Sequence, residues 1–275
     1  MKETLLKVLS MDTVERQQFM NQQGNQLIEE MILHIGSPDN ELRDQLNYRL
    51  FIELLSYQLL TSEQMTFLIQ TLQRNDYLYQ KIGEVDTDTV FTRSFSALWL
   101  TALINVDSQL HFLPDDTAKS LLEICVPYLT KEKDVRGFVG EKGWARSIAH
   151  GADLASALIS HPQFEIRLSP ILLQGIKDSF WKGTVYVDDE EERLVAIIDQ
   201  LISKEFPEEI LIEWVEQVFD KLQFYLMEVG YTPQYFNART NTLHFMKTLY
   251  FTLKFSQQMP QLKGTVSIFI SKWMK

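Results

Sequence analysis

One short segment of the chain gathers residue types that can do chemistry: Glu141 to Leu154, with the sequence EKGWARSIAHGADL. Residues three and four positions apart lie on one face of a helix, so Arg146, His150 and Asp153 form a single stripe if the segment is helical. A histidine beside an aspartate can act as an acid–base pair, and an arginine one turn away can hold an anionic group. We call these three residues the charged stripe. They are candidate ligand-binding residues, and His150 and Asp153 are also candidate catalytic residues.

The other face of this expected helix is apolar. At about 100° per residue, Trp144 and Ile148 fall on one side, opposite the charged stripe. We therefore expect a helix that begins near Gly143, with Trp144 and Ile148 in the core and the charged stripe facing a cleft. Trp144 is also counted among the candidate ligand-binding residues. The alternative is that the stripe is structural, with the aspartate orienting the histidine and the arginine packing on a neighbouring helix.

Three polar residues elsewhere are further candidates for ligand binding: Arg93, Arg239 and Asn241. Arg93 and Arg239 each interrupt an apolar stripe, and a charge at a seam between helices needs a partner or lines a cleft. Asn241 belongs to a polar stripe on the other face of the helix that carries Arg239. We expect all three to contribute to the same ligand site as the charged stripe.

Other polar features predict no further chemistry. The spacing of His, Cys, Asp and Glu gives no full set of metal ligands, so we expect neither a metal nor a cofactor. The acidic run 188–192, DDEEE, lacks the alternation and glycine of a calcium loop and is expected to be a solvated cap at a helix start. The glycines at 137, 140 and 143 follow no strand and match no phosphate-loop pattern, so they are expected to be turn glycines.

The elements that must position these residues are expected to be helices. Glycine (11) and proline (8) are scarce, and only Gly183–Val187, GTVYV, alternates like a strand. Helix-start signals recur at intervals of 18 to 29 residues, near Pro38, Ser62, Asp88, Pro114, Gly143, Pro170, Asp189, Pro207, Pro233 and Pro260. Two such intervals make a unit of about 40 to 50 residues, the period of HEAT-like helix pairs. We predict an all-α fold, a HEAT-like superhelix of about ten to twelve helices in antiparallel pairs, forming a single domain over residues 1–275.

Composition limits the kinds of partner. The formal net charge is −11, whereas proteins that bind polyanions usually have an excess of Lys and Arg, so nucleic acid and anionic membranes are not expected partners. The most apolar charge-free run, Ser94–Val106, is too short to span a bilayer, and the N-terminal residues do not resemble a secretory signal. Cys125 lies in an apolar stretch and is expected in the core. We expect a cytoplasmic protein.

Four segments resemble a bacterial family, domain of unknown function 2785. They are VFTRSFSALWL (90–100), RGFVGEKGWARSIAHGADL (136–154), DDEEERL (188–194) and NTLHFMKTLYFTL (241–253). The run GWA…AHGADL is the most specific part of the resemblance. Members of the family often have a second histidine where this chain has Arg146, which would make a metal or acid–base face that Arg146 replaces here. The resemblance implies an all-helical fold and no established activity.

Two functions fit these observations best. The first is a helical-repeat binding or scaffold protein whose cleft, lined by the GWARSIAHGAD helix, holds a protein, a peptide or a small anionic ligand. The second is an enzyme that uses His150 with Asp153 as acid and base on a small anionic substrate. A nucleic-acid protein similar to the helical-repeat DNA glycosylases would need a continuous basic stripe, which the acidic composition disfavours.

Overall fold

The structure, a computed structural model, describes residues 1–274, and every regular element in this part of the chain is a helix. The predicted all-α fold is therefore confirmed. The α-helices are α1 (Lys2–Ser10), α2 (Thr13–Leu33), α3 (Arg49–Ser56), α4 (Ser62–Leu72), α5 (Thr89–Leu110), α6 (Asp115–Cys125), the single turn α7 (Tyr128–Lys131), α8 (Ser147–Ser160), α9 (Ser169–Ser179), α10 (Glu190–Ser203), α11 (Glu208–Val229), α12 (Pro233–Ser256) and α13 (Pro260–Trp273). A π-helix η1 (Glu41–Tyr48) runs into α3, and two short 3-10 turns are η2 (Gly140–Lys142) and η3 (Ile166–Leu168).

Most helices begin where the local sequence predicts. Ser62 is the first residue of α4, and its preceding Thr61 caps the helix through a reciprocal capping box with Gln64. Proline opens the helix at positions 233 and 260, where its missing N–H costs no helical hydrogen bond. The acidic run 188–192 also lies at a helix start, because α10 begins at Glu190.

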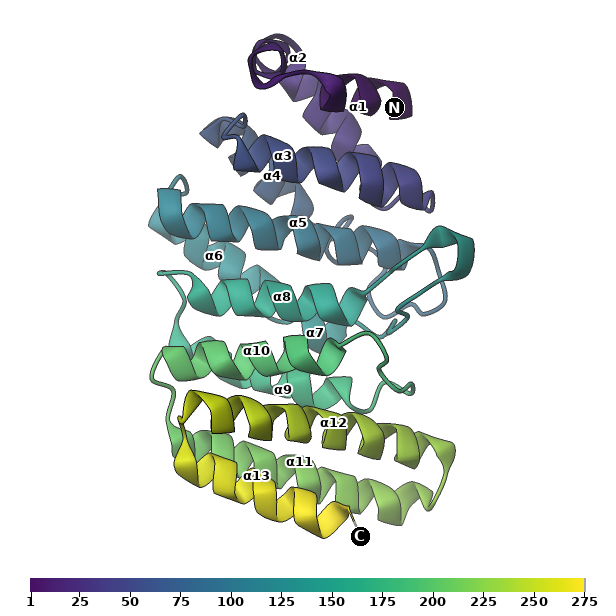
Figure 1. Cartoon of the computed structure of the whole chain (residues 1–275), viewed down its shortest axis with the longest axis vertical. Helices are drawn as coiled ribbons and strands as arrows, with labels where there is room; N and C mark the ends of the chain where they lie inside the picture. The colour runs from purple at the N-terminus through teal and green to yellow at the C-terminus, as the bar shows by residue number, and fades with distance from the viewer. Residues whose placement is uncertain (275) are drawn as a thin grey trace.

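The helices form two layers. In Figure 1, α3, α5, α8, α10 and α12 lie side by side in the layer nearer the viewer, which we call the front layer. The helices α4, α6, α7, α9 and α11 lie behind them, and the two ends of the chain are at opposite ends of the stack. At the C-terminal end, α13 packs against both α11 and α12. The front layer thus carries α8 in the middle of the molecule.

A connected set of buried apolar side chains runs between the layers, from Leu5 near the N-terminus to Val266 near the C-terminus. Cys125 lies within it, 1% exposed, and burial raises the pKa of its thiol to about 12, so the prediction of a core cysteine is confirmed. Within the core, Phe51 on α3 and Trp99 on α5 stack with ring centroids 3.9 Å apart. Among residues 1–274 no helix is both long and apolar enough to cross a bilayer.

Small side chains on α8 allow it to sit deep in the stack. The helix packs between α5 and α10 in the front layer and touches α7 behind. Ala149 and Ala152 are completely buried, and a Cβ added at Gly151 would lie 2.7 Å from Tyr128 and 2.8 Å from Leu129. The small residues therefore accommodate neighbouring protein side chains on this side of the helix, rather than a ligand.

Candidate functional site

The helix that carries the charged stripe begins later than predicted. The expected start near Gly143 is wrong, because α8 starts at Ser147 and Arg146 precedes it in the left-handed conformation, with φ 54°. Residues before it form a closed loop in which Trp144 pairs with Phe138, and Ala145 N–H donates to Gly137 O at 2.8 Å. Gly140 and Gly143 take φ of 53° and 73° in this loop, which confirms their reading as turn glycines.

Trp144 does not lie in the core, so its predicted burial is also wrong. Its side chain is 37% exposed, whereas Ile148 is 2% exposed and buried as predicted. The indole packs against Phe138 with ring centroids 5.1 Å apart, and the Arg146 guanidinium lies 4.3 Å from its centre. The physical reason is the loop: Trp144 stands before the first helical residue, so the helical spacing that joined it to Ile148 does not apply.

We expect Trp144→Ala to lower the free energy of unfolding by only about 1 kcal/mol, the size of an exposed cation–π contact with little burial. A matched control is Trp99→Ala, which removes a fully packed ring and should cost about 3 to 5 kcal/mol. Urea unfolding of both variants measures the two losses. Equal losses would show that the ring of Trp144 is a core element after all.

His150 is held by a hydrogen-bond chain that sets its tautomer. The ring is 7% exposed, and its Nδ1 lies 2.7 Å from Ser94 Oγ on α5. The Ser94 hydroxyl also donates to the backbone carbonyl of Ala145, which can only accept. The single hydroxyl proton is therefore used, and Nδ1–H must donate to Oγ. A neutral His150 consequently carries its lone pair on Nε2, an acceptor to which no other group in residues 1–274 is hydrogen-bonded.

The surroundings keep His150 uncharged. Burial is the main cause that lowers the pKa of its ring, and together with the nearby charges of Arg193, Arg146 and Arg43 it brings that pKa to about 3. Phe95 packs edge-on against the imidazole with centroids 5.5 Å apart, which leaves no room for a hydration shell on that side. His150 is thus a neutral hydrogen-bond acceptor at physiological pH.

The other two members of the charged stripe form ion pairs with the loop and helix that follow α9. Arg146 binds Asp188 through two hydrogen bonds of 2.6 and 3.0 Å, and Arg193 on α10 pairs with Asp153 at 2.5 Å. The acidic run is therefore only partly a solvated cap, because Asp188 is engaged by Arg146 and Glu190 is 4% exposed. His150 and Asp153 are not hydrogen-bonded to each other, so the expected acid–base pair does not form. The histidine faces Ser94 instead.

Sequence reasoning missed the residues that complete this region. Arg43 on η1 is fully buried, with its guanidinium 4.2 Å from the ring centre of Phe91 and 4.8 Å from that of Phe95. It donates to the carbonyls of Lys142 and Trp144 at 2.9 and 3.3 Å and so fixes the loop before α8. Because η1 was expected to be an ordinary helix start, nothing local in its sequence pointed to α8.

We use the name α8 cluster for the residues whose charges or side chains meet around His150: Arg43, Asp44, Tyr48, Arg146, His150, Asp153, Asp188 and Arg193. Burial raises the pKa of the Asp153 and Asp44 carboxyls, and burial together with the charge of Asp153 raises that of the Tyr48 phenol. The cluster is contributed by η1, the loops before α8 and α10, and the helices α8 and α10 of the front layer. Within the described chain, no group of three or more His, Cys, Asp or Glu is placed to hold a metal ion.

Arg93, Arg239 and Asn241 do not join this cluster. All five N–H donors of the fully buried Arg93 are used by protein acceptors, two of them by Glu132 at 2.7 and 3.0 Å. Arg239 donates to the carbonyl of Trp273 on α13. Asn241 accepts from Tyr186 N–H at 3.0 Å and donates to Thr184 O at 2.7 Å, so it holds the GTVYV segment, which is a loop and not a strand. These three residues serve packing between elements.

His161 also has a partner that the sequence did not reveal. Its Nε2 lies 3.0 Å from a carboxylate oxygen of Asp107, and both side chains are 3% exposed. The Nδ1 atom accepts from Gln163 N–H at 3.1 Å, so the ring donates to the aspartate through Nε2. This pair joins the end of α8 to the end of α5 and is structural.

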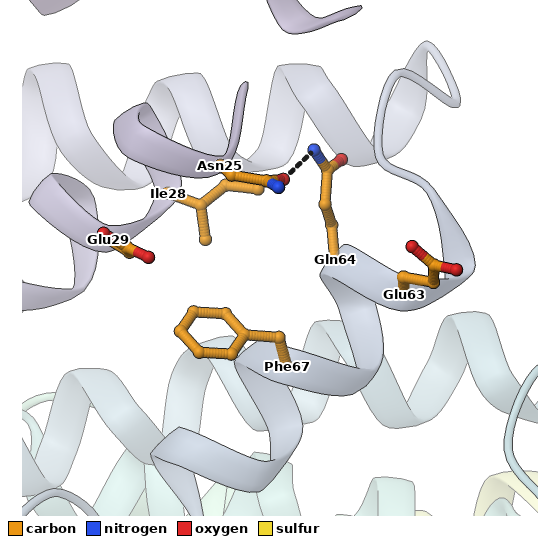
Figure 2. Close-up of a pocket in the computed structure, with 6 residues that line it drawn as sticks. All are labelled: Asn25, Ile28, Glu29, Glu63, Gln64 and Phe67. Atoms are coloured by element: carbon orange, nitrogen blue, oxygen red, sulfur yellow. Dashed lines mark hydrogen bonds between the residues drawn. The ribbon is translucent and has the colours of Figure 1, made fainter. Parts of the chain in front are cut away.

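One surface pocket of the molecule lies well away from the α8 cluster. Figure 2 shows it between α2 and α4, where Asn25 and Gln64 face each other and are joined by a hydrogen bond of 2.9 Å. Its remaining lining residues are Ile28, Glu29, Glu63 and Phe67. The pocket contains no residue that the sequence selected, and no charge there is buried.

The protein is all-helical, and the helix α8, which carries His150, follows a short glycine-containing loop and lies in the front layer. The family model described as "Protein of unknown function (DUF2785)" matches residues 78–251. That range is more than half of the chain and includes α5, α8 and α10, so the protein belongs to this family, as the resemblance of its segments predicted. No curated protein and no solved structure matches the chain.

Proposed function

We propose that this protein is a HEAT-like helical-repeat binding protein whose α8 cluster binds a peptide or small ligand carrying an anionic group. The two layers of helices in Figure 1 support the proposed architecture. The helices of the front layer lie side by side in the order in which they occur in the chain. Stacks of helix pairs bury one continuous core and present an extended face for binding. The front layer supplies that face.

The observation that carries the proposal is the convergence of three arginines on one neutral histidine. The side chains of Arg146 and Arg193 remain 34% and 41% exposed while they pair with aspartates, so a ligand can reach both side chains from the surface. An anionic group can accept from these planar donors in pairs, which is the arrangement that arginine recognises best. Nε2 of His150 adds an acceptor for an N–H or O–H group of the same ligand.

The alternative function, an acid–base enzyme, has less support. A histidine with a pKa of about 3 is a weak base at neutral pH, because general bases work best when their pKa is near the working pH. The aspartate that would orient it is paired with Arg193 instead. A binding role uses the cluster as it stands, whereas catalysis would require the histidine and aspartate to rearrange.

A thermal-shift screen with phosphates, small carboxylates and acidic peptides tests the proposal. We expect at least one of these anions to stabilise the wild-type protein, by roughly 3 kcal/mol when its concentration is a hundredfold above Kd. Arg193→Gln should abolish most of that gain. The matched control Arg74→Gln changes an arginine that is 62% exposed, lies between α4 and α5 and pairs with Asp76 rather than with the α8 cluster, and it should respond as the wild type does. Equal stabilisation of both variants would place the ligand elsewhere, and a screen without any stabilising anion would refute the proposal.

A further inference from the structure

The C-terminal helices differ from the rest of the chain in charge. Residues 233–275 contain no Asp or Glu and six basic residues, so residues 1–232 carry a formal charge of −17 against −11 for the whole. The basic residues are Arg239, Lys247, Lys254, Lys263, Lys272 and Lys275. A net charge averaged over the chain conceals this asymmetry. We refer to the outward side of α12 and α13 as the basic end.

The basic residues of the described part of this end are not neutralised within the molecule. Within the range 1–274, no ion pair includes any of the five basic residues Arg239, Lys247, Lys254, Lys263 and Lys272. By contrast, most Lys and Arg residues before Pro233 form an ion pair. Lys254 and Lys272 are exposed. The basic end therefore keeps its positive charge available to an external partner.

Large apolar side chains stand exposed among these charges. Phe251 is 49% exposed and Phe255 is 77% exposed, and their rings stack 6.1 Å apart at the C-terminal end of α12. The Lys254 ammonium lies 5.9 Å from the ring centre of Phe251, on the same side of the helix. On α13, Ile268 is 69% exposed. Terminal units of helical stacks normally end in a polar face, so exposed apolar side chains here indicate a contact.

The basic end lies next to the acidic helix α11 and away from the other acidic units of the stack. Figure 1 shows α12 as the last helix of the front layer, with α13 beside it at the C-terminal end of the stack and the acidic α11 behind α12. Charges more than about 8 Å apart are largely screened at physiological ionic strength. A surface that touches α12 and α13 is therefore little affected by the carboxylates of the units farther along the stack.

We infer that the basic end docks on an anionic lipid surface. Exposed lysines on the same two helices as exposed phenylalanine and isoleucine, with Lys254 beside Phe251, match the boundary between negative headgroups and acyl chains, where the ammonium groups attract the lipid and the apolar side chains insert. Nucleic acid fits less well, because its bases stack on aromatic rings, whereas the exposed Ile268 cannot stack on a base. Pairing with the same face of a second copy would bring like charges together.

The experiment is co-sedimentation of the full chain with vesicles of phosphatidylserine in phosphatidylcholine, compared with vesicles of phosphatidylcholine alone. The wild type should bind only the anionic vesicles and should be released by high salt. Lys247→Glu with Lys254→Glu and Lys272→Glu should reduce binding roughly tenfold or more, because each reversal turns an attraction into a repulsion. The double variant Phe251→Ser with Phe255→Ser should also weaken binding to the anionic vesicles. The salt dependence of its binding should stay unchanged, because the lysines are still present.

The matched control changes equivalent residues elsewhere on the surface: Lys7→Glu and Lys133→Glu with Leu33→Ser, whose leucine is 75% exposed. It should bind as the wild type does. Circular dichroism establishes that every variant is folded before its binding is compared. Absence of wild-type binding to anionic vesicles, or full binding by the lysine variant, would overturn the inference. Binding of a single-stranded oligonucleotide instead of vesicles, or a dimer lost in the same variants, would overturn it in favour of those partners. None of these outcomes depends on the α8 cluster.

Discussion

Replacing Glu132 by glutamine should lower the free energy of unfolding by about 3 to 5 kcal/mol, because it leaves the buried charge of Arg93 without a partner. Both side chains are completely buried. The carboxylate accepts two hydrogen bonds from Arg93, one each from the N–H groups of Lys133 and Asp134 at 2.9 Å, and one from the Tyr128 hydroxyl at 3.3 Å. Urea unfolding monitored by circular dichroism measures the loss.

Two further variants show whether the buried charge is the cause. Arg93→Met combined with Glu132→Leu should cost less than Glu132→Gln alone, since neither charge is then left buried without its partner. Asp76→Asn breaks an ion pair with Arg74 in which the side chains are 62% and 55% exposed, and it should cost less than about 1 kcal/mol. A loss for Glu132→Gln as small as that for Asp76→Asn would contradict the assignment of this pair as a core element.

The second large effect is a dependence of stability on pH that comes from His150. The folded protein holds the pKa of this ring at about 3, whereas the ordinary value is 6.5. Below pH 6.5 the unfolded chain therefore binds a proton that the folded chain rejects, and the free energy of unfolding falls as the pH drops toward 3. Between pH 7 and pH 5 this one histidine should remove about 2 kcal/mol.

His150→Asn isolates that contribution, because the asparagine amide can still donate to Ser94 Oγ but does not titrate. The difference in unfolding free energy between wild type and variant should shrink by about 2 kcal/mol from pH 7 to pH 5. The carboxylates titrate in both proteins and cancel in the comparison. A difference that stays constant with pH would mean that the imidazole of His150 is hydrated or charged in the folded state.

Much of the fold could be predicted because helix starts are encoded locally. A capping residue or proline at the beginning of an apolar period acts through its own backbone and its immediate neighbours, as Thr61 does before α4 and Thr232 before α12. The prediction near Pro38 was less accurate, because the first regular residue is Glu41 and the helix that follows is of the π type. Local signals define an approximate start but not the hydrogen-bond pattern of the first turns.

The segment before α8 shows where local reasoning stops. Trp144 and Ile148 have helical spacing, and Gly143 is a reasonable start, yet Arg146 adopts a left-handed conformation that a non-glycine residue rarely takes. That conformation is compensated by a local contact with the ring of Trp144 and by the ion pair with Asp188, which lies 42 positions later in the chain. Contacts between residues so far apart in the chain leave no periodic signal in a single sequence.

The composition of the α8 cluster illustrates the same limit. Arg146, His150 and Asp153 could be selected because they share one helix, and a partner for Arg93 could be expected because a buried charge requires one. The identity of those partners depends on packing: Glu132 for Arg93, and Arg193 for Asp153 across 40 positions. Arg43 was not selected at all, since its guanidinium reaches the loop at Lys142 from an element 99 positions earlier.

The position of Arg43 in the chain determines which fragment of this protein could keep the α8 cluster intact. Arg43 lies outside residues 78–251, the range that the family model matches, yet it covers the rings of Phe91 and Phe95 and closes the loop that leads into α8. A fragment cut to the matched range would expose those two rings and leave the carbonyls of Lys142 and Trp144 without their donor. The recognisable stretch of sequence is therefore smaller than the unit that can hold His150 in place, and the helices before Leu78 act as part of its scaffold.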